Sequence, residues 1–135
     1  MRSKARDCAF KVIFANEFGA ENESRRAVYR AAELDDEEIK YADTLIALVE
    51  RHRDEFAAVL DKYAIGFSVK RMFPVDKSVL MLALAEIMYV DDVPAVVSVD
   101  EAVGIVKKYS TEKSAGFVNG VLAAIIAGEK NEHLD

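Results

Sequence analysis

The strongest constraint on the fold is a stretch near the middle of the chain that is apolar on nearly every side. Residues 75–90 read VDKSVLMLALAEIMYV, and Glu86 is the one charge in the second half of this stretch. A helix that is apolar all round must be covered by other elements on every face. The sequence therefore predicts a central helix here, in which the Glu86 carboxylate needs either a hydrogen-bond donor or a place at an edge.

The most apolar run within this stretch, residues 79–90, does not predict a membrane span, because Glu86 interrupts it and it is far shorter than the roughly 20 residues that cross a bilayer. The N-terminus is charged and is followed by no apolar stretch of the length that a signal peptide needs. A single cysteine, Cys8, excludes an internal disulfide and fits a reducing compartment. We therefore expect a cytoplasmic protein.

The rest of the chain predicts further helices around this one. With two prolines and six glycines among 135 residues, the chain has few residues that favour turns or end helices. Apolar residues recur at helical spacing, with steps of three and four. Helices are expected at residues 3–17, 25–33, 35–63 with a bend or break near 51–53, 75–90, 98–108 and 112–128, with a possible helical turn at 69–72. The fold class is thus all-α, a compact bundle of about six or seven helices.

We expect one domain over residues 1–135, with a flexible acidic tail at 129–135. Two helix starts are predicted from side chains that cap free N–H groups. Ser3 is placed as the N-cap of the first helix. Ser98 and Glu101 have the S-x-x-E spacing of a capping box.

Catalytic chemistry is poorly supported. The two histidines, His52 and His133, have no metal-ligand spacing to each other or to Cys8. Cys8 lies on an apolar helix face, where a free cysteine usually packs as a small hydrophobe. No glycine-rich phosphate loop is present in the sequence. We expect no enzyme activity, no catalytic residues, no metal site and no cofactor.

The net charge of −6 by itself argues against nonspecific binding of nucleic acid, but the local distribution of charge favours such a partner. Arg2, Lys4, Arg6 and Lys11 crowd the first eleven residues against a single acid, Asp7. Such a basic arm can neutralise phosphates of single-stranded RNA, and an exposed aromatic ring can stack on a base.

Three phenylalanines form a row at spacings of four along the first predicted helix. Phe10 is expected in the core, whereas Phe14 and Phe18 lie toward an edge that can face a partner.

Three blocks of the sequence resemble the NusB family. The first is SKARDCA at residues 3–9, followed by Ile13 and Phe14. The second is VDKSVLMLALAEI at 75–87, within the predicted central helix. The third joins Val93-Pro94, the run 98–107 and the run FVNGVL at 117–122, and it is the most specific of the three.

The resemblance implies an all-helical protein built as two packed helical sub-bundles. It also implies a transcription antitermination factor that works within the RNA polymerase antitermination complex. Members of the family bind the boxA element of nascent RNA, notably from ribosomal RNA operons, together with NusE, a ribosomal protein of the small subunit.

The family's binding residues are carried over by position. Arg2, Lys4 and Arg6 would form the basic arm, and Phe117 would lie at the RNA surface with Lys113 adding charge nearby. The residues expected where RNA or NusE meets the protein are Phe14, Asp76 and, from its edge position, Phe18. The chain departs from the family at Met81, where an arginine is common.

Two alternatives stay open at the level of sequence. One is a helical protein-interaction module without RNA-binding activity. The other is a homodimer in which apolar side chains such as Phe14 and Phe18 cover the RNA surface.

Overall fold

The chain is all-helical throughout the part that the structure describes. The structure, a computed structural model, describes residues 2–19, 23–66 and 68–133. Seven α-helices and one 3₁₀ helix follow one another, and no strand occurs in these ranges. They are α1 (Arg2–Asn16), α2 (Glu23–Ala31), α3 (Asp36–Arg51), α4 (Arg53–Tyr63), η1 (Val69–Arg71), α5 (Pro74–Tyr89), α6 (Ala95–Tyr109) and α7 (Glu112–His133).

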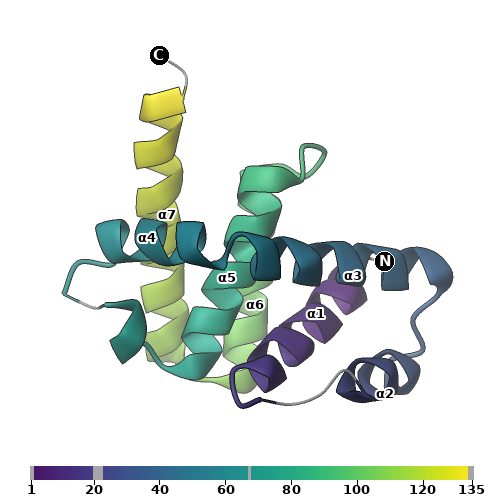
Figure 1. Ribbon diagram of the computed structural model, residues 1–135. Helices are drawn as coiled ribbons and strands as arrows, with labels where there is room; N and C mark the ends of the chain where they lie inside the picture. The colour runs from purple at the N-terminus through teal and green to yellow at the C-terminus, as the bar shows by residue number, and fades with distance from the viewer. Residues whose placement is uncertain (1, 20–22, 67, 134–135) are drawn as a thin grey trace.

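The helices form two sub-bundles that meet at α5, as Figure 1 shows. α1, α2 and α3 pack together on one side, while α6 and α7 pack against α5 and α4 on the other. α5 contacts both α1 and α3, so it belongs to both groups. Every residue from 78 to 86 on α5 is buried. The prediction of a central helix covered on all faces is therefore confirmed.

The long helix predicted from residue 35 is divided in two. Asp35 caps α3 by accepting a hydrogen bond from the Glu38 backbone N–H at 2.8 Å, and the Glu38 carboxylate accepts from the Asp35 N–H at 2.9 Å. At His52 the backbone leaves helical geometry, and α4 begins at Arg53. The break expected near residues 51–53 is confirmed, and it lets α4 turn toward α7.

Both predicted serine caps are wrong. α1 begins at Arg2, so Ser3 lies inside the helix, where its hydroxyl donates to Glu101. α6 begins at Ala95 after Pro94, whose φ of −61° already suits a helix entry, and Ser98 falls in the first turns of the helix. The Ser98 hydroxyl donates to a carboxylate of α5 rather than to its own backbone.

The acidic tail expected after residue 128 is partly helical. α7 continues to His133, and residues 134–135 lie outside the described part of the chain. The turn at the end of α1 has the geometry expected of glycine, because Gly19 has a φ of +78°.

Candidate nucleic-acid interface

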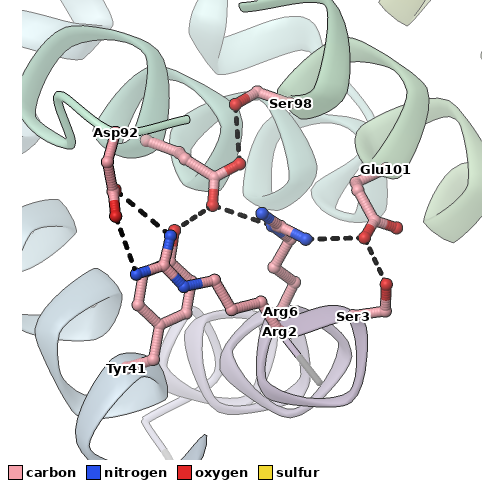
Figure 2. A network of polar contacts seen from close by, with 8 residues as sticks. Arg2, Ser3, Arg6, Tyr41, Asp92, Ser98 and Glu101 are labelled. Carbon is pink, nitrogen blue, oxygen red and sulfur yellow. Dashed lines mark hydrogen bonds and ion pairs between the residues drawn. The ribbon is translucent and has the colours of Figure 1, made fainter. Parts of the chain in front are cut away.

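A buried polar network fastens α1 to the core, and the Glu86 carboxylate on α5 is its centre. Glu86 is 2% exposed. Arg6 Nε donates to its Oε2 at 2.7 Å, the Tyr41 hydroxyl donates to the same oxygen, and Ser98 Oγ donates to Oε1 at 2.6 Å (Figure 2). The expectation of a buried donor for Glu86 is confirmed, and four helices are joined at this one carboxylate.

Arg6 does not stand on an exposed arm, and that sequence expectation is wrong. The residue is 6% exposed, and its Nη1 lies 2.6 Å from Oε1 of Glu101 in addition to the contact with Glu86. Burial lowers the pKa of Arg6, but the hydrogen bond and charge of Glu86 outweigh this effect and raise it overall. Two carboxylates from α5 and α6 therefore draw the guanidinium inward, where it holds helices together.

Arg2 is only partly available to a ligand. Its Nη1 and Nη2 each lie 3.2 Å from a carboxylate oxygen of Asp92, and its guanidinium covers the ring of Tyr41 at 4.2 Å from the centroid (Figure 2). The Arg2 side chain is still 43% exposed. The hydrogen bond that Arg2 donates to Asp92 raises the pKa of Arg2, which stays charged at any physiological pH.

Lys4 is the residue of the predicted arm that is fully presented to solvent. It is exposed and forms no ion pair with any residue in the described ranges. Lys4 lines a hollow between α1 and α6 together with Lys11, which the sequence placed in the same basic arm, and Lys108, which was not predicted as a site residue. The seven-residue spacing of Lys4 and Lys11 is a sequence signal, because it puts both on one face of α1. Lys108 comes from a distant helix and gave no such signal.

A separate pocket lies where α5 and α7 begin, and Phe117 is part of its lining. It is an apolar pocket of about 480 Å³. Its lining consists of Arg71, Met72, Phe73, Asp76, Thr111, Lys113, Ser114 and Phe117. The Phe117 ring packs partly against the core yet lines this open pocket, and Lys113 beside it is exposed. The structure thus brings Lys113, Phe117 and Asp76 together in the lining of one pocket.

Asp76 is the most unusual group in this pocket. It is 3% exposed; Oδ2 accepts a hydrogen bond from Ser114 Oγ at 3.1 Å, while Oδ1 has no hydrogen-bond partner among the described residues. Burial raises the pKa of the Asp76 carboxyl, and the Ser114 hydrogen bond only partly opposes that rise. A buried carboxylate oxygen without a donor is costly, so the pocket is suited to a ligand that brings an N–H group.

The aromatic row on α1 runs from the core to the surface. Phe10 is buried, Phe14 is partly buried and Phe18 is 66% exposed, with successive rings 5.8 Å and 5.1 Å apart. Glu17 beside them accepts from Lys77 Nζ at 3.2 Å, which ties the end of α1 to the start of α5. The predicted edge position of Phe14 and Phe18 is therefore confirmed.

Within the part of the chain that the structure describes, no group of His, Cys, Asp and Glu side chains has an arrangement that holds a metal ion. The described helices likewise include none of the length and apolarity that crossing a bilayer requires.

These features define a class: a small all-helical protein with a basic hollow and an aromatic-lined pocket. The NusB family model matches residues 3–127. A transcription antitermination protein NusB from Agathobacter rectalis is 37% identical over 126 residues, which cover 90% of this chain and 96% of that protein. The NusB of Acidothermus cellulolyticus is also 37% identical, over 128 residues that cover 95% of this chain and 88% of that protein.

A solved structure of antitermination factors NusB and NusE in complex with dsRNA contains a similar chain. It superposes with a TM-score of 0.85 at 31% identity and covers 94% of this chain and 96% of that chain. The present chain belongs to the NusB family of transcription antitermination proteins.

Proposed function

We propose that this protein is an antitermination adaptor that binds boxA-type single-stranded RNA together with NusE and performs no catalysis. The observation that carries the proposal is the match in sequence and fold to NusB proteins, one of which is solved with NusE and RNA. The surface supports it, because exposed lysines and a stacking ring are the parts that single-stranded RNA requires.

Lys4, Lys113 and Phe117 are the residues that we assign to RNA, with Arg2 contributing through its exposed half. The two lysines have no competing ion pair in the described chain and are free to neutralise phosphates. Phe117 offers a ring at a pocket that is open to solvent. Arg6 supports this surface from below by holding α1 in place.

NusE is assigned to the neighbouring surface formed by Phe14, Phe18 and Asp76. An exposed phenylalanine at the end of α1 supplies apolar area. Asp76 supplies a carboxylate oxygen that has no hydrogen-bond partner among the described residues. The ion pair of Glu17 with Lys77 connects these two parts of the surface.

The test measures binding of labelled boxA RNA over a salt series, with and without NusE. We expect affinity to fall with salt by a slope of about −0.7 per phosphate contact. Lys4→Gln should weaken binding and flatten that slope, whereas the matched charge loss Arg51→Gln, at an exposed position on α3, should not. Phe18→Ala should reduce the gain from NusE and leave binding of RNA alone unchanged. Salt-insensitive or undetectable RNA binding in both conditions rejects the proposal.

A second candidate function is protein interaction without RNA, either with another protein or as a homodimer. Exposed Ile65, Phe73 and Phe18 favour it, because these side chains are 92%, 71% and 66% exposed. Sedimentation over a range of protein concentrations separates the homodimer from the monomer. If the protein sediments as a monomer at every concentration, the homodimer hypothesis is excluded.

A further inference from the structure

Two hollows on the surface of α6 meet at a single residue, Gly104. The first hollow has a volume of about 450 Å³ and lies between α1 and α6. The second has a volume of about 530 Å³ and lies between α6 and α7. Gly104 is the one residue that lines both, and it places no side chain on the surface between them.

The first hollow is built to receive an anion. Lys4, Lys11 and Lys108 line it, and the side chains of Lys11 and Lys108 are 44% and 61% exposed. Asp7 lies beneath two of these lysines, with its carboxylate oxygens 3.4 Å from Lys11 Nζ and 3.4 Å from Lys108 Nζ. Glu101 also lines this hollow.

The negative charge of Glu101 is largely compensated by an ion pair within the protein. Its Oε1 is 2.6 Å from the buried Arg6 guanidinium. This pairing leaves three lysines against one carboxylate, Asp7, which itself pairs with two of them, Lys11 and Lys108. The net local charge is positive on a protein whose overall charge is −6.

The second hollow has a different character. Small residues line much of it, among them Ala115 and Gly116, and polar groups surround them. The carboxylates of Asp100 and Glu112 and the amide of Asn119 can accept hydrogen bonds from ribose hydroxyls and base amines. Lys107 is the cation that lines this hollow.

Glycine at position 104 is not explained by backbone conformation or by packing. Gly104 has no positive φ, and a Cβ atom built there would meet nothing within 4 Å. In the interior of an exposed helix, glycine costs about 1 kcal/mol relative to alanine. What distinguishes Gly104 is its place on α6, where it lines both hollows and puts no side chain into the passage over the helix from one to the other.

We propose that single-stranded RNA crosses α6 over Gly104, with a phosphate in the lysine hollow and the adjoining ribose and base in the second hollow. This path rests on the proposed function and adds to it a location for the backbone. It runs from Lys4 on α1 toward the start of α7, which also carries Lys113 and Phe117.

The test is to fill the passage without disturbing the fold. In Gly104→Met the new side chain starts in open space, so we expect thermal stability to be equal to that of the wild type or higher. Affinity for single-stranded RNA should fall about tenfold. The salt slope should be lower by about 0.7 for each phosphate contact that is lost. The matched control is Ala27→Met, an exposed position on α2 that should leave affinity unchanged.

A second variant changes charge in the opposite direction. Asp7→Asn removes the carboxylate beneath Lys11 and Lys108 and should tighten RNA binding several-fold at low salt. Unchanged affinity in Gly104→Met and in Asp7→Asn, with the wild type still binding in a salt-dependent way, overturns this path but leaves the proposed function standing. A wild type that binds no RNA overturns both.

Discussion

At the scale of single residues, the same type of side chain has different roles according to its surroundings. Arg6 and Lys4 are two positions apart on α1, yet one is buried between carboxylates and the other is exposed. Asp76 shows the same dependence, because most aspartates of this chain are solvated whereas this one is buried, with one oxygen that has no hydrogen-bond partner in the described part of the chain. Its pKa is raised, so the folded state binds the proton more tightly than the unfolded state does.

The first prediction concerns Asp76→Asn. The wild type bears the cost of a buried charge at every pH above the folded-state pKa of Asp76. This cost disappears as the pH falls below the ordinary carboxyl value. The variant should therefore be more stable than the wild type at neutral pH, by about 1 kcal/mol, and the difference should shrink toward zero in acid.

Urea unfolding at a series of pH values measures this difference. If the variant is less stable than the wild type at pH 7, the buried carboxylate has a stabilising partner, and the interpretation of Asp76 as a group held ready for a ligand is wrong.

At the scale of elements, one buried polar network joins four of the helices, α1, α3, α5 and α6. Arg6 on α1 reaches Glu86 on α5 and Glu101 on α6, while Tyr41 on α3 reaches Glu86 as well. Helical periodicity in the sequence predicted these helices and the break near His52. It did not predict the network, because its members are separated by up to 95 positions along the chain.

The second prediction is that Arg6→Met destabilises the protein by about 3 kcal/mol. Removing one partner from a buried ion pair leaves the carboxylate of Glu86 without its charged donor. Lys4→Gln is the matched control on the same helix, and it should change the free energy of unfolding by less than about 0.5 kcal/mol. Equal stability of the two variants would show that the network contributes little.

The Arg6→Met result also decides how RNA-binding data are interpreted. A loss of RNA binding in an Arg6 variant follows from displacement of α1 and is no evidence of direct contact. Lys4 is therefore the informative position for a charge-loss experiment.

At the scale of the whole molecule, α5 lies in both sub-bundles and joins them into one core. Neither sub-bundle can cover its own apolar surface without α5. The hollows, in turn, lie between helices, so their shape depends on this joint packing.

The third prediction is a single cooperative unfolding transition. Far-ultraviolet circular dichroism and tyrosine fluorescence should give the same midpoint in urea, because the two sub-bundles share α5. Two separated midpoints would mean that the sub-bundles unfold independently and that α5 belongs to only one of them.

The sequence by itself determined the helices and the central position of residues 75–90. Resemblance to a family predicted roles for Phe117 and Asp76 in binding, and the structure places both in the lining of one pocket. The helices and the resemblance depend on local periodicity and on residue types at fixed spacing. Only the tertiary structure decided that Arg6 is buried, that Ser3 and Ser98 bond across helices instead of capping them, and that Lys108 joins Lys4 around a hollow. The physical reason is that burial and ion pairing depend on side chains that are brought together from distant positions, and spacing along the chain does not encode those distances.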